Sequence, residues 1–160
     1  MQTENKLKKF AKTGYTVTKA LYFAACALCL IFIVLAIALS CTDAIKTLTK
    51  KETAILFATL AFYSFMSIGL LWNIQEIFNT IRREGTPFCE RVLHYLKKTA
   101  IFFILVSTVP AIVGTALLRI ICPATEIVFP IELFGVLAGI GLLIAVPFLK
   151  YGTESINKNK

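Results

Sequence analysis

Two cysteines stand at the spacing of a redox pair, in the segment Cys26-Ala-Leu-Cys29. Residues three apart share a face of a helix, so the two thiols would lie close together. Cys29, however, lies about 16 Å from the end of a long apolar run at 1.5 Å per residue, near the middle of a bilayer. No second pair lies in an outer loop to exchange with it, and buried cysteines commonly act as small apolar residues. The pair therefore does not predict redox catalysis.

The other cysteines and the single histidine offer little further chemistry. Cys41 and Cys122 each follow an apolar run at the expected outer surface, where they could form a disulfide if the two runs are neighbours. Cys89 falls in a segment that we expect to be cytoplasmic and reduced. His94 stands apart from any recognisable set of metal ligands. Because no nucleophile, phosphate-loop or zinc motif appears, we predict no metal, no cofactor and no enzymatic activity.

One polar helix face carries the remaining candidate chemistry. Gly69, Asn73, Glu76 and Thr80 recur at the offsets of a single helix face. Glu76 is the carboxylate that we expect nearest to the membrane interior, and charge in lipid is costly enough to make such a group a functional candidate. Its place near a membrane boundary fits a structural role equally, bonded to Asn73 or to a neighbouring helix. Both roles stay open.

Four apolar runs must position these residues. Hydrophobic residues make up 58% of the 160-residue chain and charged residues only 16%, with a mean hydropathy of +0.78. A soluble domain carries about 25% charged residues, so the apolar surplus must face lipid. The runs match the ~20 residues that a helix needs to cross a bilayer. We predict an all-α, polytopic membrane four-helix bundle, one domain over residues 1–160, with spans at 15–40, 53–74, 99–121 and 131–149.

The formal charge of +8 is concentrated between the runs. Thirteen Lys and Arg residues fall in the N-terminal segment, the middle loop and the C-terminal tail, against four on the other side. The positive-inside rule therefore places both termini and the middle loop in the cytoplasm, with the chain in the cell membrane. This pattern predicts contact with anionic lipid headgroups and no direct binding of nucleic acid.

The middle loop has the most defined local pattern. Apolar residues keep helical spacing beyond the second run, so the second helix is predicted to continue to about Glu84. Gly85 then stands where a left-handed C-cap is expected. Thr86 is suited to cap the next helix, with Pro87 in its first turn. We predict a cytoplasmic hairpin over residues 75–98, two to three helical turns deep.

Small residues predict where the helices approach closely. The segment Gly135-Val-Leu-Ala-Gly139 is a close-approach motif in the fourth run. Ser107, Ala111 and Thr115 form a stripe of small residues in the third run. The glycine pair fits either a contact inside the bundle or a contact between two copies in a homo-oligomer.

Several stretches of the chain carry a family resemblance. These are Asn73-Ile-Gln-Glu-Ile-Phe, Gly85-Thr-Pro-Phe with the helix after it, and Phe148-Leu-Lys-Tyr-Gly-Thr-Glu. Together they resemble the bacterial membrane-protein family called domain of unknown function 2975. The tail Ser155-Ile-Asn-Lys-Asn-Lys departs from it, because it lacks the acidic and then aliphatic end. The resemblance implies four spans and no known activity. The pairing of some relatives with small helix-turn-helix regulators implies a cytoplasmic protein partner.

Two functions follow from these patterns. The first is a non-enzymatic regulatory or sensory protein that binds a cytoplasmic partner, such as a small regulator, through the 75–98 hairpin. The alternative is a small transporter or channel subunit, in which Asn73 and Glu76 line a path through an oligomer. The hairpin residues that would meet a partner or lipid headgroups are Arg82, Arg83, Gly85, Pro87, Phe88, Arg91, Lys97 and Lys98.

Overall fold

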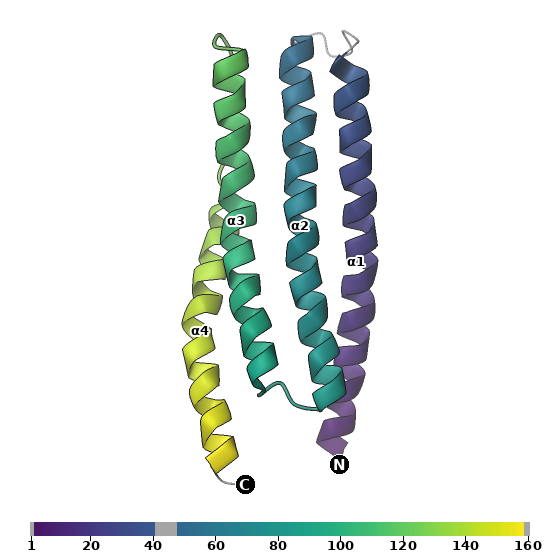
Figure 1. The fold of residues 1–160 in the computed structure, drawn as a ribbon, viewed down its shortest axis with the longest axis vertical. Coiled ribbons are helices and arrows are strands. Elements are labelled where there is room, and N and C mark those ends of the chain that lie inside the picture. Colours follow the sequence, from purple (N-terminus) through teal and green to yellow (C-terminus); the bar gives the residue numbers. More distant parts are fainter. Residues whose placement is uncertain (1, 41–47, 159–160) are drawn as a thin grey trace.

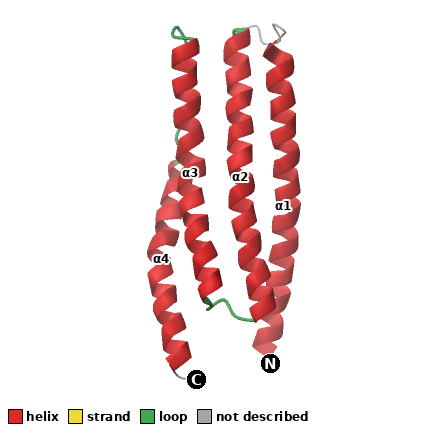
Figure 2. Cartoon of the chain, in the orientation of Figure 1, coloured by secondary structure: helices red, strands yellow, loops and turns green. Residues whose placement is uncertain are grey.

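A computed structural model describes residues 2–40 and 48–158, and the regular secondary structure within these ranges is α-helical. Four long helices run up and down in chain order (Figures 1 and 2). Each is long and apolar enough to cross a membrane, as the sequence predicts. Both chain termini lie at one end of the molecule, together with the turn between the second and third helices (Figure 1). We call this end the hairpin end and the opposite one the loop end. The helices are α1 (Gln2–Ser40), α2 (Lys50–Glu84), α3 (Glu90–Ile121) and α4 (Leu133–Lys158).

Defined caps set both ends of α2. At its start, the Glu52 N–H donates to the Thr49 hydroxyl at 3.3 Å, and the Glu52 carboxylate accepts from the Thr49 N–H at 2.8 Å. This reciprocal pair satisfies donors that the first turn leaves unpaired. At its end, Gly85 adopts φ 68° and donates its N–H to the Ile81 carbonyl at 2.9 Å. A left-handed φ favours glycine, which lacks the Cβ that would clash. The predicted end at Glu84 and the predicted cap are confirmed.

The start of α3 differs from the prediction. Its N-cap is Cys89 rather than Thr86, and Pro87 lies before the helix instead of in its first turn. The Thr86 hydroxyl accepts a hydrogen bond from the Phe88 N–H at 3.1 Å, which closes a small local turn. Threonine side chains form such turns in competition with helix caps. The predicted roles of Thr86 and Pro87 in α3 are therefore wrong.

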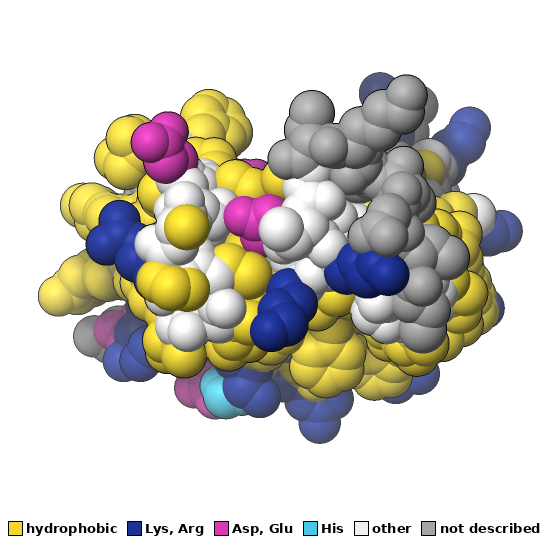
Figure 3. Space-filling view, turned by 90° about the horizontal axis from the view of Figure 1, so that it is seen from above, with side chains coloured by type: hydrophobic (Ala, Val, Ile, Leu, Met, Phe, Trp, Pro, Cys, Tyr) yellow, Lys and Arg dark blue, Asp and Glu magenta, His cyan; other side chains and the backbone are white. Residues whose placement is uncertain are grey.

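The four helices form an open row instead of a closed bundle. α1 packs on α2, α2 on α3 and α3 on α4, and within the described ranges α1 and α4 do not pack together. They lie at the two ends of the row in Figure 1. Each outer helix is therefore covered on one side only. Hydrophobic side chains make up most of the rim seen from the loop end in Figure 3, as expected of a surface that faces lipid.

Glycines bring α4 against α3. A Cβ added at Gly139 would stand 2.7 Å from the Ala100 carbonyl oxygen, and one at Gly135 would collide with the Ser107 hydroxyl. Ser107 and Ala111, from the predicted small-residue stripe, are 3% and 1% exposed. The glycine pair thus packs inside the chain, which settles the alternative that the sequence leaves open.

The chain between α3 and α4 is irregular. The N–H of Glu132 donates to the carbonyl of Ser107, in the middle of α3, at 3.3 Å, and α4 begins at the next residue. In Figure 1, α4 accordingly starts part-way down α3. The chain after α3 runs back along that helix as an irregular segment, residues 122–132. α4 therefore starts two residues after the predicted start of the span at 131, and Leu133–Gly152 is itself long and apolar enough to cross a membrane.

Candidate functional site

Charged residues on α3 mark the expected limits of the hydrocarbon core. Lys98 and Arg119 are exposed and, at 1.5 Å per residue, lie about 32 Å apart along the helix. This length matches the ~30 Å thickness of the core. Ser107 lies between them, about 14 Å from Lys98 and about 18 Å from Arg119. Residues that contact Ser107 therefore lie near the middle of the core.

Glu132 is placed at this depth by its hydrogen bond to Ser107. Its side chain is exposed on the protein surface and makes no hydrogen bond or ion pair with any residue that the structure describes. The sequence points to Glu76 instead, because Glu132 stands at the edge of an apolar run, where a charge is ordinary. The signal that points to Glu132 is Pro130, which discourages a helix from starting earlier and extends the chain before it.

A cavity of about 470 Å³ opens beside Glu132. Two of its serines, Ser64 and Ser67, donate to carbonyls of their own helix at 3.0 and 2.8 Å, so each hydroxyl oxygen can still accept a hydrogen bond. Apolar walls with a few convergent polar groups are typical of small-molecule sites. The cavity is lined by Ala25 and Leu28 of α1, Leu60, Tyr63, Ser64 and Ser67 of α2, Val106 of α3, and Phe129, Pro130 and Glu132 of the irregular segment.

The irregular segment can lie at membrane depth because protein covers part of its backbone and the rest lines this cavity. Non-helical backbone at membrane depth persists only where protein buries it or where it lines a polar cavity, since lipid offers no hydrogen bonds. Here the Phe129 N–H donates to the Thr115 hydroxyl at 3.0 Å, and the Glu132 N–H donates to the Ser107 carbonyl. Pro130 has no N–H to satisfy. Side chain and backbone of α3 thus hold the segment in place, with one face towards the cavity.

An ionised Glu132 is costly at this position. A carboxylate at the centre of a bilayer costs about 2.5–3.5 kcal/mol on the insertion scale. The N-terminus of α4, where Glu132 stands, returns typically about 0.3–1 kcal/mol through its dipole. No Lys or Arg lines the cavity to supply the difference. The carboxylate therefore needs water or a cation that comes from outside the chain.

Asn73 and Glu76 lie elsewhere. Asn73 is 7% exposed and donates its side-chain amide to the Gly69 carbonyl of the same helix at 2.9 Å. The Glu76 carboxylate accepts from the Asn79 amide at 3.4 Å. Neither residue lines the cavity at Glu132. Their local hydrogen bonds fit the structural role that the sequence leaves open for them.

The hairpin residues lie together at the hairpin end. The Arg82 guanidinium stacks on the Tyr15 ring at 4.9 Å and ties α2 to α1. Arg91 approaches Glu84 across the turn at 3.9 Å, an exposed pair that contributes little to stability. The basic hairpin residues Arg82, Arg83, Arg91, Lys97 and Lys98 are exposed, Phe88 is 40% exposed, and Gly85 and Pro87 are half-buried in the turn.

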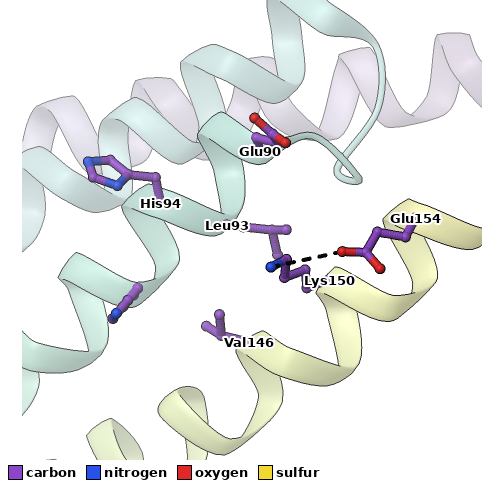
Figure 4. A pocket seen from close by; sticks show the side chains of 7 residues that line it. Glu90, Leu93, His94, Val146, Lys150 and Glu154 are labelled. Carbon is purple, nitrogen blue, oxygen red and sulfur yellow. Dashed lines mark ion pairs between the residues drawn. The ribbon is translucent and has the colours of Figure 1, made fainter. Parts of the chain in front are cut away.

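A second groove, of about 420 Å³, lies between α3 and α4 at the hairpin end (Figure 4). Lys150 and Glu154 pair within α4 at 3.9 Å, shown by the dashed line. His94 and Glu90 face the groove from α3. In the described parts of the chain, no three potential metal-ligating side chains come together here or elsewhere.

The cysteines take structural positions where the structure describes them. The Cys29 thiol is buried and donates to the Ala61 carbonyl at 3.5 Å, as a small residue between α1 and α2. Cys26 and Cys122 are half-buried free thiols. Cys41 lies outside the described residues, so its pairing with Cys122 stays a prediction.

In comparisons with known proteins, no family model, curated protein or solved structure matches this chain. The resemblance to the domain of unknown function 2975 family, carried by residues 73–78, 85–88 and 148–154, stays a prediction.

Proposed function

We propose that this chain is a non-enzymatic, multi-pass protein of the cell membrane that binds an acidic segment of a cytoplasmic protein at its hairpin end. The observation that carries the proposal is a group of exposed cations beyond the expected headgroup layer. We call this group, Lys6, Lys9, Arg83 and Arg91, the tip cluster.

The depth of the tip cluster separates a protein partner from lipid. Arg91 lies about 10 Å beyond Lys98 along α3. The headgroup layer adds only about 5–8 Å on each side of the hydrocarbon core. Arg91 therefore projects past the headgroups into water, whereas Lys97 and Lys98 lie among them. The positive-inside rule accounts for Lys97 and Lys98, because cations at this depth orient the helices. It does not account for the tip cluster, for which we propose a protein partner.

Contacts between α1 and α2 bring Lys6 and Lys9, the two lysines of the tip cluster, to the depth of Arg83. The Phe10 and Phe78 rings meet edge to face at 6.1 Å, and Gly14 lies directly under Phe78. Measured along the helices, Lys9 lies about 7–8 Å beyond Gly14 and Arg83 about 7–8 Å beyond Phe78, both towards the tip. The rigid pairing of the two helices thus presents cations from both on one surface.

The surface has the character of a site for an acidic and partly apolar segment. Arg91 has Glu84 as a close but exposed partner, and the cations exceed the carboxylates around the turn. Phe10 is 68% exposed and Phe88 40% exposed at the same end. Positive surface attracts acidic partners and raises their association rate, while aromatic side chains supply contact area.

A photo-crosslinking residue at Phe88, in tagged protein in native membranes, tests the proposal. We expect one cytoplasmic protein to crosslink, and its yield to fall about tenfold or more in Arg83→Gln/Arg91→Gln, because two cations that meet its acidic segment are lost. The matched control is Lys97→Gln/Lys98→Gln, which removes the same charge at headgroup depth and should keep the crosslink. Replacement of Gly85 and Pro87 together should also abolish it without loss of membrane insertion.

Two results would overturn the docking proposal. One is crosslinking to lipid alone. The other is an equal loss of the protein crosslink in the two charge variants, since that would assign the tip cluster to general attraction by anionic headgroups.

The alternative of a small transporter or channel subunit keeps one specific observation in its favour. This is the cavity at Glu132 in the middle of the core, rather than the Asn73 and Glu76 path expected from the sequence. An intramembrane carboxylate commonly marks an ion or substrate path.

A further inference from the structure

We propose that the cavity beside Glu132 binds a hydrophobic monovalent cation, with the Glu132 carboxylate as its counter-ion. The proposal is independent of the docking surface, because it concerns a different depth of the molecule and different residues. It assigns a small-molecule binding site within the hydrocarbon core.

The charge of the cavity is complementary to that of a cation. Glu132 is the only ionisable carboxylate among the lining residues of the cavity, and no basic residue accompanies it. The titratable side chain on which its charge acts is that of Tyr63, which carries no positive charge. A single negative charge in an apolar surrounding selects a ligand with a single positive charge, because a second charge would again stand uncompensated in lipid.

The walls of the cavity suit an organic cation. Most lining residues are apolar, and Tyr63 adds an aromatic ring, whose face attracts cations. A volume of about 470 Å³ lies in the range of small-molecule sites. A small metal ion would have to replace its hydration shell with oxygen ligands, and few oxygens line these walls. An organic ammonium or phosphonium ion with apolar substituents fits both the charge and the walls.

The cavity is open to the lipid. Glu132 is exposed at the protein surface while it lies at mid-core depth, so the cavity can be reached sideways from the lipid. A hydrophobic cation partitions into the bilayer and can approach by this route. A hydrated ion cannot do so, because the hydrocarbon core excludes it.

The test uses tetraphenylphosphonium as the probe and the full chain in nanodiscs of neutral phosphatidylcholine. Radiolabelled probe is titrated against the unmodified protein and Glu132→Gln. We expect saturable binding that weakens at least about tenfold in Glu132→Gln, because the counter-ion is lost. The matched control, Glu76→Gln, removes a carboxylate outside the cavity and should bind as the unmodified chain does. Tetraphenylborate has similar size and apolar surface with the opposite charge, and should not displace the probe.

Two further measurements distinguish loss of the binding site from unfolding of the variant. Each variant is first checked for a single monodisperse peak and an unchanged helical circular-dichroism spectrum. Ala25→Phe then fills the cavity from α1 and leaves Glu132 in place, and it should abolish binding too. The proposal is overturned if Glu132→Gln, folded, binds the probe as tightly as the unmodified chain. It is equally overturned if tetraphenylborate competes with the probe.

Discussion

At the scale of single residues, the contact between α3 and α4 depends on glycines of α4, which have no side chain. In lipid no hydrophobic force draws helices together, so their association depends on close packing and polar contacts. Gly139 allows the backbone of α4 to reach that of α3, where the Ala100 carbonyl leaves no space for a methyl group. Gly141, two residues on, has no atom within 4 Å of an added Cβ. The two glycines therefore form a natural comparison.

We predict opposite effects of alanine at these two positions. Gly139→Ala should lower the free energy of unfolding by about 1–3 kcal/mol, because the methyl group forces rigid backbones apart. Gly141→Ala should leave it unchanged or raise it by up to about 1 kcal/mol, because alanine is the better helix former. Unfolding of the purified protein in mixed micelles with increasing sodium dodecyl sulfate measures both. Equal effects of the two changes would contradict the close approach of α4 to α3.

Residue chemistry explains what the sequence could and could not predict at this scale. Gly85 is predictable because its role depends on its own backbone angle and on the helix just before it. The role of Thr86 is not, because a turn to Phe88 competes with a helix cap and the two differ little in energy. The depth of Glu132 could not be predicted either, for another reason. Its depth depends on where α4 lies against α3, which is a tertiary property.

At the scale of the helices, local signals predict lengths well. All four apolar runs are helices, and α2 ends at the predicted residue because a glycine cap follows it. The packing order along an open row was not predicted, since a run of apolar residues facing lipid looks like one facing a neighbour. The start of α2 has a further signal, the Thr49 and Glu52 capping box, whose strength depends on pH.

Acid should loosen the first turn of α2. The pKa of Glu52 is held below its ordinary value of 4.5, chiefly because the Thr49 backbone N–H donates to it, and then through the side chains of Thr125 and Thr49. A depressed pKa contributes stability that is present above the unfolded value and is lost as pH falls through the folded value. Between about pH 6 and about pH 3, hydrogen exchange at the Thr49 amide should therefore accelerate relative to the intrinsic rate. In Glu52→Gln this relative rate should stay constant with pH, and an equal acceleration in both proteins would exclude the carboxylate as its cause.

At the scale of the whole molecule, the row leaves two helices partly uncovered. Phe134 of α4 is 86% exposed and Leu30 of α1 is 65% exposed. In water such surfaces would indicate a partner, but in lipid they are ordinary, because acyl chains are as apolar as the side chains. The open row thus requires no second copy, and the homo-oligomer stays a prediction. The distribution of charge between the two ends is more informative, since it predicts the orientation on which cytoplasmic docking depends.

Two native cysteines at opposite ends report this orientation. Cys89 lies at the hairpin end and Cys122 at the loop end, and both are half-buried free thiols. In variants that keep one cysteine each, a membrane-impermeant maleimide should label Cys122 in intact cells and Cys89 only after the membrane is opened. This follows because basic segments stay in the cytoplasm.

Burial, then a hydrogen bond with Glu84, raises the pKa of the Cys89 thiol, so labelling must be done at alkaline pH, where more thiolate is present. A version with no cysteines gives the background. Labelling of Cys89 but not Cys122 in intact cells would show the inverted orientation, and the tip cluster would then face the exterior, where no cytoplasmic partner can reach it.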